Sequence, residues 1–306
     1  MTSEGEIVQQ ERQRYLRVAN LVFGGPWALV PETYQTICDL MQYRVDGHRL
    51  SPDEIQDRIG AAPVRRGAAR SGAVAVMPLY GVLVQRLGPI SAMSGATSTD
   101  AFGAGFRQAV EDPGISALVI DMDSPGGSVY GVQELWQTIM DARGQKPIVA
   151  VANSLAASGA YWIATAADEI VVTPGGEVGS IGVFASHEDV SEAEAKLGVK
   201  TTLVGAGEKK LSGNPHAPLT DEARADLQGK VDAYYDMFVG AVSRGRGVER
   251  EQVLAGFGQG GTVLAKEAVR MGMADRVDTL QGTIDRLVGS RRAARSAPDR
   301  RRMALL

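Results

Sequence analysis

The sequence predicts an α/β fold, because two consecutive segments change from a buried-strand pattern to a helical pattern through a turn rich in small residues. The apolar run Ala117–Asp123 leads through the turn 124–128 into a helical pattern over 129–143. The next strand pattern, Pro147–Asn153, passes through small residues to Ser158 and a short helical pattern. Parallel strands end at the same edge of a sheet, so we expect the two turns to share one site.

The other elements surround these two units. A strand pattern over 73–83 opens the main domain, followed by a loop over 88–99, a helix over 99–111 and a long helix over 219–244. The apolar face of that long helix is expected in the core: Leu227, Val231, Tyr234, Tyr235, Phe238 and Val242. We therefore expect four parts: a helical N-terminal extension (1–61), a linker (62–72), the main domain (73–289) and a basic disordered tail (290–306).

The N-terminal extension is expected to be helical. Its helices are predicted over 11–23, over 31–45, where Pro31 opens the helix, and after a capping box at Ser51–Glu54. These helices either cover the main domain or dock a partner.

Ser158 is the strongest candidate for chemistry. A serine between a strand and a helix is held by the backbone, and Gly159 behind it lets a substrate carbonyl approach the main chain. The first N–H groups of a helix lack partners within the helix and suit an oxyanion. Gly126 and Gly127, in the upstream turn, could supply N–H groups from the other side. The alternative for each turn alone is ordinary turn and capping chemistry.

A serine nucleophile needs a base to take its proton. The chain has three histidines, and His187, with Asp189 nearby, is the best placed of them. The other solution is a lysine stripped of solvent, so that its amine is neutral. Lys209 and Lys210 are the candidates, within a segment rich in glycine, serine and proline that could equally be a solvated loop.

Four ordered motifs resemble the signal peptide peptidase A family, which includes the phage protease C-like head-maturation peptidases. They are Asp123–Ser128, Ala156–Ala164, Gly179–Val183 and Lys209–Pro215. The resemblance covers roughly 73 to 285, and Gly25–Ala28 matches a segment of the phage branch. It implies the fold of Clp protease and crotonase subunits, a stack of β-β-α units.

The resemblance also implies roles for single residues. The nucleophile of the family falls on Ser158 and its general-base lysine on Lys210, with Lys209 as a neighbour that could take its place. This chain departs from the commoner Lys-Asp pair, because Leu211 follows the lysine. The implied oxyanion donors are Gly159 and one of Gly126 and Gly127, with Gly126 preferred.

Composition narrows the class of protein. The chain has 306 residues, 44% of them hydrophobic, which is enough for one large core. A formal charge of −4 gives no general reason to expect nucleic acid or an anionic membrane as a partner. With one cysteine there is no internal disulfide and no zinc signature. Neither a secretory signal nor an 18-residue apolar run is visible, so we expect a soluble, cytoplasmic protein. The resemblance to the phage branch implies that this compartment is the host cytoplasm or the phage prohead.

Together these features predict a serine endopeptidase with a Ser158–Lys210 dyad and no metal or organic cofactor. The expected substrates are polypeptides of an assembling phage head, such as scaffold, portal or the chain's own termini, and the protein is expected to form a homo-oligomer. The alternatives are a cytosolic peptidase of the same family, a crotonase-like acyl-CoA enzyme, and a non-catalytic assembly scaffold.

Overall fold

The computed structural model describes residues 25–45, 69–71, 73–87, 96–196 and 198–296. The helices expected over 11–23 and after Ser51, His48 and most of the loop expected over 88–99 lie outside these residues.

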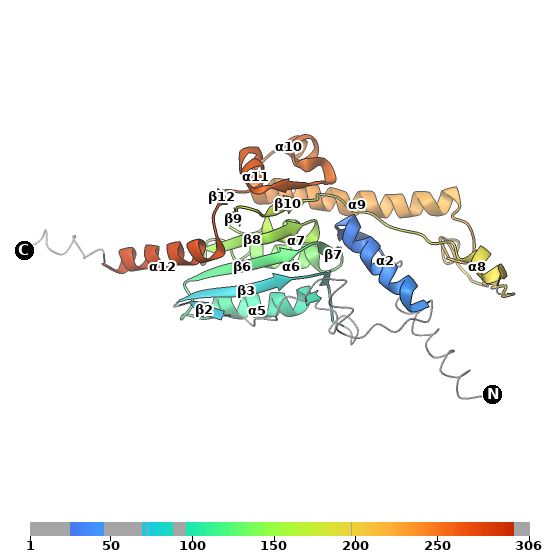
Figure 1. Ribbon diagram of the computed structural model, residues 1–306, viewed down its shortest axis with the longest axis horizontal. Coiled ribbons are helices and arrows are strands. Elements are labelled where there is room, and N and C mark those ends of the chain that lie inside the picture. Colours follow the sequence, from blue (N-terminus) through green and yellow to red (C-terminus); the bar gives the residue numbers. More distant parts are fainter. Residues whose placement is uncertain (1–24, 46–68, 72, 88–95, 197, 297–306) are drawn as a thin grey trace, which may run out of the picture.

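A sheet of parallel strands forms the centre of the fold (Figure 1). Strand β6 (Ala117–Ser124) lies between β3 (Val74–Tyr80) and β8 (Ile148–Ala157), and all three run parallel. β9 (Glu169–Val172) pairs with the first half of β8, and β10 (Glu177–Gly179) pairs with its end. The edges are completed by β2 (Ala69–Ser71), β11 (Thr262–Leu264) and β12 (Arg276–Val277). The β-branched and apolar run that predicted a buried strand thus lies in the middle of the sheet.

A second, smaller sheet has the strand order β1-β7-β4-β5. Its strands are β1 (Trp27–Leu29), β4 (Leu83–Val84), β5 (Thr97–Ser98) and β7 (Gly126–Ser128). Strands β4 and β7 each directly follow a strand of the main sheet and precede a helix, α5 (Thr99–Glu111) or α6 (Val132–Met140). These two β-β-α units confirm the predicted fold class.

Helices cover both faces of the main sheet. Alternate side chains of β3 and β6, such as Leu79 and Ile120, face a core shared with α5, α6 and the buried helix α7 (Gly159–Ala164). The other set, such as Val74 and Val119, packs with Ile284 of α12 (Leu280–Ser296). The alternation of side chains along each strand thereby produces two separate cores.

Helix α9 (Asp221–Arg246) belongs to the body at one end only. Phe238 stacks on Trp162 of α7, with 4.7 Å between the ring centroids, and Val242 is fully buried. The predicted core face is right for these two residues, but Leu227, Val231, Tyr234 and Tyr235 are only half-buried. Figure 1 shows the N-terminal half of α9 extending beyond the sheet towards α8 (Ser191–Lys196). Helix α10 (Arg250–Gly256) contacts α9, and α11 (Ala265–Met271) contacts β10, β11 and β12.

Three expectations for the terminal segments need correction. Helix α2 (Pro31–Val45) has the predicted bounds, but Trp27–Leu29 before it forms strand β1, so the described part of the extension is not purely helical. Residues Ala69–Ser71 of the expected linker form β2, because they pair antiparallel with the start of β3. Helix α12 continues to Ser296, so the first residues of the tail are helical rather than disordered.

Candidate active site

Ser158 lies at the junction of β8 and α7 and is held in a strained conformation. Its φ of 54° and ψ of −120° lie outside the regions that non-glycine residues usually adopt. The surroundings impose this conformation, because the Ser158 N–H donates to the carbonyl of Gly179 (2.7 Å) and its carbonyl accepts from Trp162 (2.9 Å). Ser158 is only 1% exposed to solvent. The surrounding main chain therefore fixes the direction of its hydroxyl.

The hydroxyl of Ser158 does not cap the helix that follows it. Ser158 is the N-cap residue of α7 and makes no side-chain hydrogen bond to the helix. Its Oγ lies 3.5 Å from the carbonyl oxygen of Gly182, which is a long contact. Capping, the ordinary explanation for a serine at this position, therefore does not account for Ser158.

The two glycine turns meet, as the sequence predicted. A β-carbon added to Gly126 would lie 2.9 Å from the nitrogen of Gly159 and 3.0 Å from the Cβ of Ser158. With a φ of 96°, Gly126 also adopts a conformation that residues with a side chain rarely take. The turn after β6 therefore packs directly against the start of α7.

The N–H groups of the glycine pair have different partners. The Gly126 N–H donates to Oγ of Ser124 (3.2 Å), and the Ser124 hydroxyl in turn donates to the Gly81 carbonyl (2.7 Å). Gly127 pairs with Ala28 of β1, and a β-carbon on Gly127 would lie 2.0 Å from the Leu83 carbonyl oxygen. At both positions the main chain of a neighbouring segment lies so close that only glycine fits.

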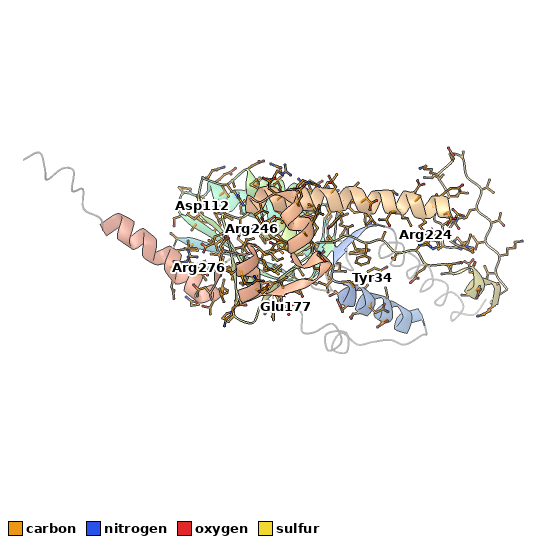
Figure 2. All side chains as sticks on the ribbon, turned by 90° about the horizontal axis from the view of Figure 1, so that it is seen from above. Tyr34, Asp112, Glu177, Arg224, Arg246 and Arg276 are labelled. Carbon is orange, nitrogen blue, oxygen red and sulfur yellow. The ribbon has the colours of Figure 1, made fainter. Side chains whose placement is uncertain are left out.

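Lys210 lies in a loop that belongs to the far end of α9. We call residues 191–237, which comprise α8, the loop after it and the N-terminal part of α9, the arm. Lys209 Nζ pairs with Asp226 of α9, His216 Nδ1 lies 2.8 Å from Glu194 of α8, and Val190 N–H donates to Pro215. Figure 2 shows Arg246 against the body and Arg224 near the opposite end of the same helix. The loop with Lys210 is held at that opposite end, and its side chain is exposed.

The described histidines are held by the same loop. Nε2 of His187 lies 3.1 Å from the carbonyl oxygen of Asn214, and His216 pairs with Glu194. Asp189, the carboxylate expected beside His187, accepts a hydrogen bond from the Ser191 N–H (2.9 Å) instead. Its contact with Asn214 gives His187 a structural role in holding the loop.

Strand β1 is not predicted from the sequence, although it contacts the site. The segment Gly25–Ala28 was noted only as a motif, because three residues are too few for an alternating pattern to show. In the fold, Trp27, Ala28 and Leu29 are all buried next to the Gly126–Gly127 turn.

The described residues show neither a metal-ion site nor a membrane-spanning helix. No group of three or more histidine, cysteine, aspartate or glutamate side chains among them is placed to hold a metal ion. None of the described helices is both long enough and apolar enough to span a membrane.

Known proteins with similar sequences include two from phages. Residues 141–292 match the family described as peptidase family S49. Capsid assembly protease C of Escherichia phage lambda is 35% identical over 204 residues, which are 67% of this chain and 46% of that protein. Head-tail preconnector protein GP5 of Enterobacteria phage P21 is 35% identical over 213 residues, 70% of this chain and 42% of that protein. This chain therefore spans less than half the length of these two relatives.

A shorter relative is matched over most of its length. A protein of Synechocystis sp. that carries a protease name is 30% identical over 188 residues, which are 59% of this chain and 68% of that protein. The match to the family includes β8, Ser158 and α7, since they lie within residues 141–292. The chain belongs to peptidase family S49.

Proposed function

We propose that this chain is a serine endopeptidase whose nucleophile is Ser158. The observation that carries the proposal is the strained, uncapped Ser158 hydroxyl at the start of α7, packed against the Gly126–Gly127 turn. A serine fixed in this way attacks a peptide carbonyl and forms an acyl-enzyme, which water then hydrolyses. Membership of a peptidase family supports the same reaction.

We assign oxyanion stabilisation to the N–H groups of Gly159 and Gly127. Gly159 is the first residue of α7, where helix N–H groups have no partner within the helix. Of the upstream pair, the Gly126 N–H donates within its own turn to Ser124, whereas Gly127 faces strand β1 across the site, so we take Gly127 rather than the Gly126 donor preferred from the sequence. Donors fixed in the main chain cost no reorganisation when charge develops on the carbonyl oxygen.

We assign the general base to Lys210 supplied by a second copy of the chain. In a single copy the arm extends away from α7, and it carries exposed apolar side chains, among them Val204 (94% exposed) and Met237 (49%). Contact with another subunit would bury these side chains and exclude water from the lysine. A lysine amine acts as a base only when it is desolvated.

The proposed substrates are proteins of an assembling phage head, cut in the host cytoplasm or in the prohead. The two phage relatives are named for capsid assembly and for the head-tail preconnector. Because the chain covers less than half of each, the identity of the substrate rests on similarity and needs a direct test.

The test is labelling with a fluorophosphonate followed by peptide mapping. We expect a single adduct on Ser158 and cleavage of a co-expressed scaffold or portal protein that stops when the adduct forms. An intact protein that takes no label at Ser158 and cleaves nothing would contradict the peptidase assignment and favour an acyl-CoA enzyme or a scaffold.

A further inference from the structure

Strand β1 lies between the two segments that border Ser158. On one side it pairs antiparallel with β7, in the register Trp27↔Ser128, Ala28↔Gly127 and Leu29↔Gly126. On the other side Trp27 exchanges two main-chain hydrogen bonds with Phe184, of 2.8 and 3.0 Å. Phe184 follows the segment that holds Ser158 through Gly179 and Gly182. Thus β1 fills the space between these two borders of the site.

The carbonyl of Ala28 faces the glycine main chain beside Ser158. Its oxygen is 2.2 Å from a β-carbon placed on Gly126 and 3.2 Å from one placed on Gly159. Val30 donates to Pro125 (3.0 Å) and Val129 to Pro26 (3.5 Å), so the alternation of an antiparallel ladder makes Ala28 and Gly127 a hydrogen-bonding pair. Ala28 therefore directs its carbonyl towards the main chain to which we assign oxyanion binding.

An extended peptide that binds by adding a strand to a sheet makes this same set of contacts. Main-chain hydrogen bonds to strands on either side supply affinity, and alternate side chains enter pockets. Trp27, Ala28 and Leu29 are 5%, 0% and 2% exposed, so the surrounding protein encloses their side chains.

On these contacts, and resting on the proposed function, we propose that residues Trp27–Leu29 are an internal substrate mimic that blocks the peptide-binding groove. β1 must leave the groove before a protein substrate pairs with β7 and Phe184. The segment is suited to leaving, because it is three residues long and continues into α2, where residues 31–39 are exposed or half-buried. Tyr34 of α2 holds it, through ring contacts to Trp27 and Phe184 and a hydrogen bond with Ser186.

The first experiment measures the opening of β1 without any need for activity. In amide hydrogen exchange of the full chain, we expect the Trp27 and Val30 N–H groups to exchange at least about 100-fold faster than those in the centre of β8, since local opening costs less than global unfolding. Equal protection of β1 and β8 would mean that β1 is a fixed strand, and would overturn the proposal.

The second experiment locks the strand in place. Trp27 and Ser128 are directly opposite and fall between the hydrogen-bonded pairs, where Cα atoms lie about 4.5 Å apart, a spacing that a disulfide spans. Trp27→Cys with Ser128→Cys, in a Cys38→Ser background, should form a reversible cross-link. We expect the oxidised protein to react with a fluorophosphonate at least tenfold more slowly than the same protein after reduction.

The controls separate this proposal from the proposed function. The Cys38→Ser parent should label equally with and without reductant. Equal labelling of the oxidised and reduced double-cysteine protein would overturn the block, and failure of the cross-link to form would contradict the pairing itself. If the parent takes no label, the peptidase assignment fails, while hydrogen exchange still decides whether β1 opens.

Discussion

Gly126 and Ser158 belong to different strand–helix units, yet a β-carbon on Gly126 would lie 3.0 Å from the Cβ of Ser158. This contact leaves no room for a side chain at position 126, and it places the main chain of one unit against the nucleophile proposed in the next. Substitutions at Gly126 and at Ser158 therefore test the same site.

Ser158→Ala is expected to abolish fluorophosphonate labelling and proteolysis while the fold remains intact, because only one oxygen is removed. The matched control is Ser154→Ala, since Ser154 also has a positive φ, of 107°, and lies near the end of β8 but is exposed. We expect Ser154→Ala to retain labelling. Loss of labelling in both variants, with unchanged circular dichroism, would indicate an effect of the strand end rather than of the nucleophile.

Gly126→Ala is expected to slow labelling by about 100-fold or more, the typical cost of disturbing an oxyanion site. The added methyl group would meet the Ala28 carbonyl oxygen at 2.2 Å while β1 is in place, and after β1 has left the groove it would still press on the Gly159 nitrogen and on Ser158. Gly144→Ala is the control, because Gly144 has a similar φ of 81° but no heavy atom within 4 Å of the added carbon. It should cost about 1 kcal/mol of stability through backbone strain and leave labelling unchanged. A comparable loss of labelling in both variants would contradict the proposed contact.

Lys210→Ala is expected to remove proteolysis, whereas Lys209→Ala should retain it, because the Lys209 amine pairs with Asp226. If a second copy supplies the base, co-refolding Ser158→Ala with Lys210→Ala should restore cleavage that neither variant shows alone. Ser158→Ala co-refolded with the Ser158→Ala, Lys210→Ala double variant should stay inactive. An inactive first mixture, with active wild type, would place both residues of the dyad in one chain.

His187→Ala is expected to change the rate of proteolysis by less than about threefold, since loss of a true general base costs about 100-fold or more. The imidazole contacts the Asn214 carbonyl in the arm, so its removal should mainly loosen that loop. Steady-state kinetics on a peptide substrate would check this. A loss as large as that of Ser158→Ala would replace the lysine with the histidine.

Asp275→Asn is expected to lower stability at neutral pH by about 1–2 kcal/mol, since it removes a charged, two-point hydrogen bond from Arg246 that is partly exposed to solvent. Burial alone raises the pKa of Asp275, but the hydrogen bonds from Arg246 and the Ile170 N–H and the nearby arginine charges lower it overall.

A lowered folded-state pKa fixes the direction of the pH dependence. The stabilisation by Asp275 is complete above the pKa of the unfolded chain and is lost as the pH falls through the lower folded value. Denaturant melts from pH 7 to pH 3 should therefore show the two proteins converging in acid. Glu267→Gln, which breaks an exposed pair with Arg270, is the control and should change little. A difference between wild type and Asp275→Asn that is as large at pH 3 as at pH 7 would contradict the ionic origin.

The local parts of the fold were predictable where a pattern repeats within the element. The bounds of α5 and α2 are those expected from the sequence, and Pro31 marks the start of α2 as predicted. The meeting of the Gly126 turn with Ser158 also followed, because parallel strands end at one edge. Strand β1 did not, because its three residues owe their conformation to distant partners, in the Gly126–Ser128 turn and at Phe184. The position of the arm could not be predicted for a related reason. The apolar spacing of a sequence identifies a helix, but it does not show which part of the helix packs against the body of the protein.

Helix α9 is held against the body near its C-terminal end, so a small rotation there moves its N-terminal end by a larger distance. Arg143 donates to the main-chain carbonyls of Thr165 and Ala166, at the end of α7, and of Gly245 in α9. Gly245 lies so close to Thr165 that an added β-carbon would be 2.2 Å from its carbonyl oxygen, which fixes the pivot directly behind the helix of Ser158. At 1.5 Å per residue the 26 residues of α9 are about 39 Å long, so a tilt of about 5° moves the far end by about 3 Å. A displacement of one hydrogen-bond length at the lysine loop therefore needs only a small rotation at Gly245, and substitutions there should alter subunit geometry without contacting either partner of the proposed dyad.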